Sequence, residues 1–589
     1  MPVMKFSRRL PGRVSALTAA LIALAAGAAA QTALKPGETP PERPAGTYVS
    51  RESVTVTNID VVVVDGKGNR VTGLKKSDFI VFEDGLEQPV TNFFAVEQGR
   101  MTVVAEEESS PPPAGAPAAA PAPAPALPAE AVTVAAPKTR ILIFIDNLSL
   151  QPGNRNRVFK KLEEWVREAV KGDTEAMIVV WNRSLKIRRK FTNDGRDLSD
   201  VLKQIEEESG LGSNRATSRR DVIKDIDRST SVSEATQSAR TYANEYVNDM
   251  NFTIEAMKST ITNLAGIEGR KIMIHVSDGL PQAPGAELWK YISEKYRQES
   301  TVLMNNFEFD QTPKYISVIQ AANAAGVTLY TIDAAGLTVD SNVSAETRGQ
   351  EQRIDTFVEQ NNQTAPLQLM AEETGGEAII NRNDVSGPLK QIEADYTSYY
   401  SLGYRSIRTG LDRPHKVEVK LRNKKGLTAR ARRSYVEKGL ETKTTEAVMS
   451  GLYFAREENP MAVGLEIGQP VPVQSGNFSV PVRIRIPYSR IAMLPDGKNV
   501  RGRLTFYFVV MDALEKKSDL SSQNKTIEID AKRFEELGKK DFVYDVQMIM
   551  IPGRQRLSLA VRDDTTNQTS FLQQNIFVSV FSGQAPAKN

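Results

Sequence analysis

The stretch Arg140–Leu150, RILIFIDNLSL, decides how the centre of this chain folds. Five apolar residues run without a break from Ile141 to Ile145, and Asp146 follows them. A short apolar run of this kind predicts a strand buried on both faces, as in a parallel sheet that helices cover. Because open α/β sheets bind ligands at the carboxyl ends of their strands, Asp146 is a candidate site residue.

The same pattern returns at Lys271–Leu280, KIMIHVSDGL, where Asp278 follows the apolar run. Two aspartates at two strand ends are expected to meet over one crevice. Strand and helix patterns alternate from residue 138 onward, which predicts a mostly parallel sheet with helices on both faces. The predicted strands are 141–145, 176–181, 185–191 (an edge strand), 272–276, 327–332 and 378–380, and the predicted helices are 158–170, 197–205 (capped by Asp197), 316–325, 367–374 and 385–396.

A longer helical pattern interrupts this alternation between Ser229 and Ala265. Apolar residues recur there at spacings of three and four, and no proline or glycine breaks the run before its end. This predicts a helix of roughly thirty residues, about 45 Å long. Two interpretations stay open: a surface helix packed on a local helical partner, or a protruding arm that docks another protein.

Composition excludes several functional classes. The 589 residues predict three or four domains. The 75 basic and 72 acidic residues nearly balance, so there is no electrostatic footprint for nucleic acid. The chain has no cysteine and two histidines, His275 and His415, which leaves few residues for zinc or Ser-His chemistry. His275 lies within a predicted strand and is interpreted as a core residue, so no catalytic residue is assigned and we expect no enzyme.

The first thirty residues have the composition of a secretory signal. Basic residues between Lys5 and Arg13 precede an apolar, alanine-rich run that ends in Ala28–Ala30. This predicts a signal peptide cleaved after Ala30 and a periplasmic or secreted protein with no membrane span after cleavage. The alternative is an uncleaved anchor, but the run is shorter than the ~20 residues of a typical span.

The remaining segments differ in composition and define the expected domains. Short strand patterns with turn signals predict a small β domain at the start and an antiparallel β-sandwich at the end. We expect a signal peptide at 1–30, a disordered leader at 31–50, a small β domain at 51–103, a Pro/Ala-rich linker at 104–137, an α/β domain at 138–438 with a helical insertion at about 210–265 and a β extension at about 396–436, and a C-terminal β-sandwich at 439–589.

Several motifs, taken in order, resemble one family. They are DVVVVD at 60–65, SDFIVFEDG at 77–85, ILIFID at 141–146, VSDG at 276–279, EETGGEAIINRND at 372–384, SYYSLGY at 398–404 and HKVEVKLRNKKGLTARARRSYV at 415–436. Over residues 54–436 this order is similar to that of exported bacterial von Willebrand factor A (VWFA)-related proteins of the Acidobacteria type. PGRQRLSLAVRDD at 552–564 resembles their trailing domain loosely. The resemblance implies a doubly wound VWFA-like sheet.

The resemblance also implies a metal-ion-dependent adhesion site. Such a site uses Asp-x-Ser-x-Ser after the first strand, a threonine from a neighbouring loop and an aspartate after the fourth strand. Mg²⁺ takes an octahedron of oxygen ligands there and keeps one position for a partner's carboxylate. Asp146 and Asp278 match the two aspartates, but Leu148 and Leu150 occupy the serine positions. Leucine offers no oxygen, so two direct ligands are missing.

Substitutes for the missing ligands are few. Ser149 is adjacent but one place out of register, and Asn147 is a further candidate. Thr217, in a loop predicted at 212–218, is a candidate for the threonine. Asp146, Ser149 and Asp278 could hold a weakly bound, mostly hydrated Mg²⁺. Alternatively, Asp146 caps a turn and Asp278 orders its loop through local hydrogen bonds, and the site is degenerate.

These observations give two expected functions. The first is a non-enzymatic, exported, adhesion-type protein that binds a protein partner through its VWFA-like domain, with a degenerate metal site and no organic cofactor. The second is a structural cell-envelope scaffold whose β domains assemble and whose A domain is vestigial.

Overall fold

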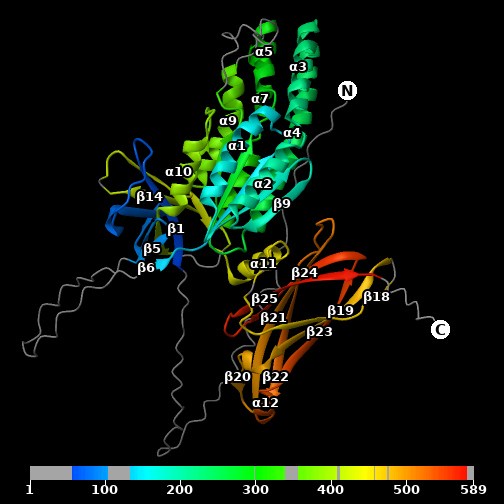
Figure 1. The fold of residues 1–589 in the computed structure, drawn as a ribbon. Helices are drawn as coiled ribbons and strands as arrows, with labels where there is room; N and C mark the ends of the chain where they lie inside the picture. The colour runs from blue at the N-terminus through cyan, green and yellow to red at the C-terminus, as the bar shows by residue number, and fades with distance from the viewer. Residues whose placement is uncertain are drawn as a thin grey trace, which may run out of the picture. The chain divides into compact units, whose positions relative to one another are not determined.

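The computed structural model describes residues 56–103, 133–297, 299–337, 356–406, 412–422, 424–454, 456, 458–473 and 476–579. The predicted signal peptide, the leader and residues 104–132 of the predicted linker lie outside these described residues. Within them the chain is a multi-domain, mixed α/β protein with several antiparallel sheets, one mixed sheet and a β-rich C-terminal region (Figure 1).

The apolar run at 141–145 forms an inner strand of the mixed, six-stranded sheet. This strand, β7, pairs in parallel with β10 on one side and with β8 on the other. Every residue from Ile141 to Asp146 is buried, because helices cover both faces of the sheet. The spatial order is β12 (Ala378–Ile379), β11 (Val327–Asp333), β10 (Arg270–Ser277), β7 (Thr139–Asp146), β8 (Thr174–Trp181) and β9 (Leu185–Thr192). The predicted strands are confirmed, and β9 is the antiparallel edge strand.

Alternate side chains of β7 enter two separate apolar clusters. Ile141, Ile143 and Ile145 pack with residues of α1, α2 and α10. Leu142 and Phe144 pack on the other face with residues of α4, α5, α8 and α9. The bounds are α1 (Pro152–Ala169), α2 (Gly195–Glu206), α4 (Val232–Asn263), α5 (Ala286–Tyr296), α6 (Glu299–Leu303), α7 (Asn305–Glu308), α8 (Thr312–Ala325), α9 (Thr356–Glu373) and α10 (Ser386–Thr397).

The predicted long helix is confirmed as α4, which has 32 residues. The Ser231 hydroxyl caps it by accepting the N–H of Glu234 at 3.2 Å. Its buried positions continue from Ala235 to Asn263, and it packs against α3, α5 and α8. The helix therefore packs on local helical partners and does not stand alone.

Helices α5, α6 and α7 were not predicted, and α9 begins at Thr356 instead of residue 367. Two further details of the helices also differ from the prediction. Residues 212–218 begin a helix, α3 (Gly212–Arg228), whose mostly polar sequence gives only a weak apolar stripe. The N-cap of α2 is Asp194 and not Asp197. The Asp194 carboxylate accepts the N–H groups of Arg196 and Asp197 at 3.0 and 3.2 Å.

The first β segment and the segment after α10 share two antiparallel sheets. Residues 56–103 and 399–436 are far apart in sequence, yet β1 pairs with both β13 and β15. Ile59, Val61 and Val63 of β1 pack against Tyr400 and Leu402 in one apolar cluster. The elements are β1 (Val56–Asp65), η1 (Lys76–Asp78), β2 (Phe79–Glu83), β3 (Leu86–Gln88), β4 (Val90–Glu97), β5 (Arg100–Val103), β6 (Thr133–Ala135), β13 (Tyr399–Arg405), β14 (Pro414–Leu421), β15 (Leu427–Arg430) and β16 (Ser434–Val436).

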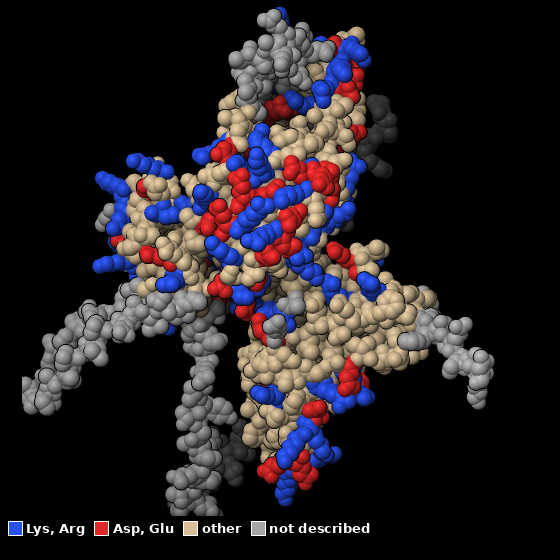
Figure 2. All heavy atoms as spheres, viewed as in Figure 1, with Lys and Arg blue, Asp and Glu red and all other residues tan. Residues whose placement is uncertain are grey.

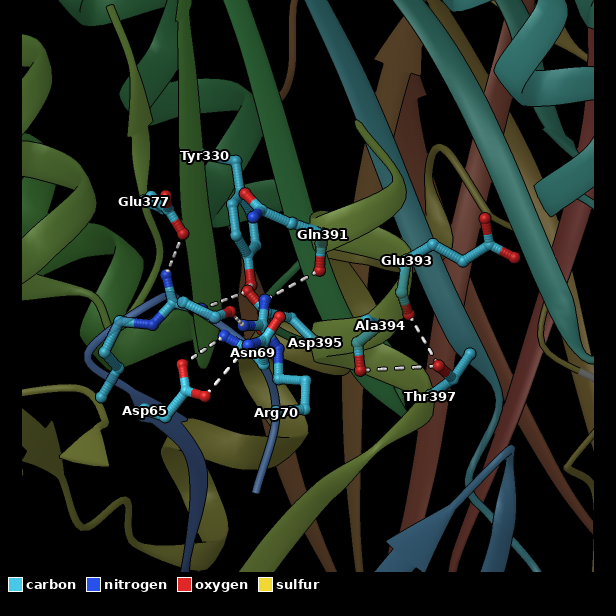
Figure 3. Close-up of polar contacts among 12 residues, drawn as sticks. Asp65, Asn69, Arg70, Tyr330, Glu377, Gln391, Glu393, Ala394, Asp395 and Thr397 are labelled. Atoms are coloured by element: carbon cyan, nitrogen blue, oxygen red, sulfur yellow. Dashed lines mark hydrogen bonds and ion pairs between the residues drawn. The ribbon is translucent and has the colours of Figure 1, made fainter. Parts of the chain in front are cut away.

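A buried carboxylate joins these β sheets to the α/β region. Asp395 of α10 is 1% exposed and forms ion pairs with Arg70 and with Arg430 of β15. The Tyr330 hydroxyl donates to the same carboxylate at 2.8 Å. Figure 3 shows Arg70, Tyr330 and Asp395 converging, with Glu377 beside them. One acidic side chain thus forms ion pairs with two cations that come from different segments, and Glu377 supplies a second negative charge beside Arg430.

The C-terminal region is β-rich. Its two antiparallel sheets share one apolar cluster, to which Val482 and Ile484 of β19 and Phe506 of β21 contribute. A helix that was not predicted, α11 (Leu440–Gly451), precedes them. The other elements are β17 (Gly464–Ile467), β18 (Val471–Pro472), β19 (Phe478–Pro487), η4 (Tyr488–Arg490), β20 (Leu494–Asp496), β21 (Asn499–Asp512), β22 (Ser521–Asp530), α12 (Ala531–Leu537), β23 (Asp541–Met550), β24 (Gly553–Asp563) and β25 (Thr569–Val578).

Surface charge in the α/β region is mixed in sign. Figure 2 shows lysines and arginines interleaved with aspartates and glutamates over the face that α1 and α2 form. Among the described residues, no helix combines the length and the apolar character needed to cross a bilayer.

Candidate functional site

Three neighbouring parallel strands each end in an aspartate. Asp146 is the last residue of β7, Asp278 follows β10, and Asp333 is the last residue of β11. The pairing of Ser277 with Asp333 places the ends of β10 and β11 side by side. The sequence analysis singled out Asp146 and Asp278 but not Asp333. The signal was available, because the predicted strand 327–332 also runs directly into an aspartate.

The Asp146 carboxylate is used within its own turn. It is 1% exposed, and its Oδ1 accepts the N–H groups of Leu148 and Ser149 at 3.2 and 3.3 Å. The Ser149 hydroxyl donates to the backbone carbonyl of Asp146 at 3.1 Å. Burial raises the pKa of Asp146, and hydrogen bonds from Ser149 and the charge of Arg215 oppose the rise. These contacts are those of an aspartate that orders a turn.

Asp278 is held through one carboxylate oxygen only. Its Oδ2 accepts the N–H of Gln151 at 2.8 Å and the side-chain amide of Asn154 at 3.0 Å. Its Oδ1 is buried and has no hydrogen-bond partner among the described residues. Burial raises the pKa of Asp278 to about 7, and the nearby Asp333 and Asp146 carboxylates add to the rise. Burial also raises the pKa of Asp333 to about 6.

A cavity of about 240 Å³ opens at this edge of the sheet. Ser149, Asp278 and Asp333 line it from the strand ends, whereas Asp146 is not among its lining residues. Helices α3, α4 and α9 form the opposite wall, with Arg215, Tyr246 and Gln363 among the lining residues. The structure thus brings Ser149 and Asp278 to one cavity, whereas Asp146 is buried and does not line it.

The two leucines at the serine positions belong to the core. Leu148 is 5% exposed and packs in the cluster with α4, and Leu150 is fully buried in the cluster on the opposite face of the sheet. Thr217 is exposed on α3, where its hydroxyl donates to the carbonyl of Ser213 at 3.0 Å. Asn147 is fully buried, and its side-chain oxygen accepts a hydrogen bond from Nη1 of Arg155 at 3.0 Å. None of these side chains offers an oxygen to the cavity.

A guanidinium from α3 lies near Asp146. Arg215 stacks over the ring of Tyr246 at 3.8 Å and forms an ion pair with Asp249 at 3.3 Å. The start of α3 can approach because residue 212 is glycine: a Cβ there would lie 2.3 Å from the carbonyl oxygen of Ser149. Sequence reasoning missed Arg215 because residues 212–218 were predicted as a loop within the helical insertion at about 210–265.

The donor set does not fit the octahedral Mg²⁺ site that the resemblance implies. Oδ1 of Asp146 already accepts two amides, and the leucines supply no oxygen. Among the residues that the structure describes, no three or more His, Asp or Glu side chains are grouped as a metal site requires. Oδ1 of Asp278, Oε2 of Glu287 and Oε1 of Gln363 are buried oxygens of cavity-lining residues that have no hydrogen-bond partner among the described residues. The assignment of Asp146, Ser149 and Asp278 as ligands stays a prediction.

His275 is a core residue of the paired strand β10. It is fully buried in β10, its ring lies 5.8 Å from that of Phe144, and neither ring nitrogen has a partner among the described residues. Burial lowers the pKa of His275 to about 3, so the ring is neutral at pH 7.

Comparison with known proteins gives no family. No protein-family model matches the chain, and no curated protein matches it. Among solved structures, it is similar to an aerotolerance-related membrane protein from Bacteroides fragilis, with 12% identity over 44% of this chain and 98% of that one and a TM-score of 0.21. It is also similar to the conserved hypothetical protein BatB from Bacteroides thetaiotaomicron, with 11% identity over 44% and 96% of the two chains and a TM-score of 0.21. It is similar as well to a mutant of the PilB minor pilin from Streptococcus sanguinis, with 8% identity over 59% of this chain and 89% of that one and a TM-score of 0.24. At such TM-scores, none of these likenesses supports an argument about function.

Proposed function

We propose that this chain is an exported, non-enzymatic binding protein whose VWFA-like α/β domain presents its strand-end edge to a protein partner without a bridging cation. In this proposal the mixed sheet is a doubly wound VWFA-like sheet and the C-terminal region is a β-sandwich. The order β12-β11-β10-β7-β8-β9, with one antiparallel edge strand and helices against both faces, supports the first part.

The observation that carries the proposal is the chemistry around Asp146. Two buried leucines stand at the positions that need hydroxyl ligands. Burial raises the pKa of the Asp146 carboxyl, and the charge of the Arg215 guanidinium opposes part of that rise. A fixed positive charge from the protein thus takes over part of the role that a cation would have beside this carboxylate. Recognition at this edge then depends on shape and on the side chains that line the cavity.

Partner capture with and without divalent cations tests the proposal. The full chain is immobilised and exposed to a bacterial envelope extract in Mg²⁺ or in EDTA. The proposal expects one defined partner in both buffers, and expects its loss when Gln363, which lines the cavity, is changed to Arg. Gln237→Arg, on the exposed side of α4, is the control and should leave capture intact. Capture only in Mg²⁺ contradicts the proposal.

The scaffold function has one observation in its favour. Among the described residues, the edge strand β23 pairs with β19 alone, and it exposes Val543 and Ile549, which are 45% and 62% accessible. An exposed, partly apolar edge strand can pair with another chain. Concentration-dependent self-association that Ile549→Lys abolishes, together with no captured partner, would favour the scaffold.

A further inference from the structure

A second polar cavity lies at the opposite, amino end of the central sheet. Its volume is about 230 Å³, and β1, β15, the start of β10 and the end of α8 contribute to its walls. This is smaller than the roughly 300–1,000 Å³ of pockets that hold drug-sized ligands, so its occupant must be small. Four cationic side chains and one carboxylate line it: Arg270, Lys271, Arg430, Arg432 and Asp60.

Two of the four cations have acidic partners. Arg430 pairs with Asp395 and Glu377 at 2.5 Å each. Arg270 lies 3.6 Å from the Asp60 carboxylate and stacks over the ring of Tyr399 at 3.9 Å. The charges of these two side chains are therefore balanced within the protein.

The other two cations donate only to neutral carbonyls. Nζ of Lys271 donates to the carbonyl of Ile267 at 3.0 Å, and Nη2 of Arg432 donates to the carbonyl of Asn58 at 2.6 Å. Neither forms an ion pair with a carboxylate among the described residues, and Nε of Arg432 is buried without a hydrogen-bond partner there. The carbonyl groups that accept from Lys271 come just after the carboxyl end of α4 in the chain, and the dipole of a helix favours a cation at that end. This explains the position of Lys271. The charge of Arg432 is offset in part by the Asp60 carboxylate, which also interacts with Arg270.

The two cationic groups point at the same place. A Cβ built on Gly326, which ends α8 with a φ of +66°, would lie 3.7 Å from Nη1 of Arg432 and 4.0 Å from Nζ of Lys271. Lys271 is 9% exposed, and burial together with the charges of Lys438 and Arg432 lowers its pKa to about 8. Asp60 is the one carboxylate among the cavity's lining residues, against four cationic side chains. The excess of positive charge favours an anion, because arginine cannot lose its charge by deprotonation.

We propose that the cavity between β1, β15 and the amino end of the central sheet binds a small phosphate-type oxyanion through Lys271 and Arg432. A planar guanidinium matches two oxygens of a tetrahedral anion, and an ammonium supplies a point charge beside it. The anion is either free phosphate or the phosphate end of a small monoester. This site is separate from the strand-end cavity and does not depend on the function proposed above.

Calorimetric titration of the full chain with inorganic phosphate at low ionic strength tests the site, with sodium chloride as the ionic control. The expected result is saturable binding with a dissociation constant in the millimolar range or tighter. Arg432→Gln and Lys271→Met should each weaken it roughly tenfold or more, because each removes a charge-assisted hydrogen bond. Arg433→Gln is the matched control: the next residue, 57% exposed and paired with Glu373, loses the same charge outside the cavity.

Thermal unfolding keeps the test decisive if a variant is unstable. Phosphate should raise the melting temperature of the wild type and of Arg433→Gln, but not that of Arg432→Gln, because a ligand stabilises only a fold that binds it. Titration with glycerol 3-phosphate identifies the source of the anion. Binding of glycerol 3-phosphate supports the phosphate end of a monoester. If inorganic phosphate binds and glycerol 3-phosphate does not, the ligand is the free ion. The absence of saturable phosphate binding to the wild type, or an equal loss in Arg433→Gln, would overturn the site.

Discussion

The two ends of the central sheet bury charges of opposite sign, and they deal with them differently. At the carboxyl end, Asp146 and Asp278 accept hydrogen bonds from nearby amides, and burial raises the pKa values of both. At the amino end, Lys271 and Arg432 donate only to carbonyls. A buried carboxyl group can take up a proton and become neutral, whereas a guanidinium stays charged. The carboxyl end can therefore lose its charge by protonation. The amino end keeps more cations than its Asp60 carboxylate can balance, and the proposed anion would reduce this excess.

The largest expected effect comes from removing the carboxylate that does balance arginines near the amino end. Asp395→Asn leaves Arg70 and Arg430 as buried cations without their shared partner. Breaking a buried pair in this way should lower the free energy of unfolding by about 3–5 kcal/mol. Urea unfolding followed by tryptophan fluorescence measures it, since the chain's three tryptophans, Trp165, Trp181 and Trp289, all lie in the α/β region.

Glu393→Gln is the control for Asp395→Asn. It makes the same change of charge two residues earlier on α10, at a side chain that has no ion pair among the described residues. It should cost less than about 0.5 kcal/mol. Equal losses in the two variants would show that the Asp395 network has no special weight.

The next largest effect is expected from a substitution that restores a hydroxyl at the carboxyl end of the sheet. Leu150→Ser recreates one serine of the adhesion motif but empties a fully buried core position. The cavity and the buried hydroxyl should cost about 2–4 kcal/mol and should not create Mg²⁺ affinity. The same urea assay measures the loss, and Ile316→Ser, at a position that is 42% exposed, should cost much less. Tight Mg²⁺ binding by Leu150→Ser would show that a missing hydroxyl was the sole defect.

The pH dependence of stability separates the two ends further. Because the pKa values of Asp278 and Asp333 are raised to about 7 and about 6 from 3.8, the folded state holds more protons than the unfolded state between about pH 4 and 7. The melting temperature should therefore fall as pH rises through this window, and Asp278→Asn should reduce the slope. Asp384→Asn, at an exposed carboxyl whose pKa is lowered, should leave the slope unchanged. An identical slope in wild type and Asp278→Asn would contradict the assigned environment.

The smallest effect is expected at Thr217. Its exposed hydroxyl bonds only the carbonyl one turn earlier on α3. Thr217→Ala should change the free energy of unfolding by less than about 0.5 kcal/mol and leave any cation affinity unaltered. A loss of Mg²⁺ affinity in this variant would return Thr217 to the site.

The apolar runs of the central sheet were readable from sequence because strands buried on both faces show their whole length as hydrophobic residues. β7, β10 and β11 were found within two residues of their ends. Helix α4 was readable for a similar reason, since its apolar spacing is unbroken. By contrast, α3 is amphipathic only at Ile223 and Ile226, so its periodicity gave no signal.

The pairing of distant segments was less accessible. Short strands could be predicted within 51–103 and within about 396–436, but nothing local reports that β1 lies between β13 and β15. The same limit applies to charge. Lys271 and Arg432 are 161 residues apart in the chain, and only the fold brings both close to Gly326. Asp278 could be predicted at a strand end, but its unpartnered oxygen could not.

One titration addresses the central claim, that the strand-end edge works without a cation. Mg²⁺ is titrated calorimetrically into the full chain and into its Asp278→Ala and Asp146→Ala variants. The account predicts no saturable binding to the wild type and indistinguishable traces for the three proteins. A saturable, one-site heat in the wild type that disappears in both variants would contradict it.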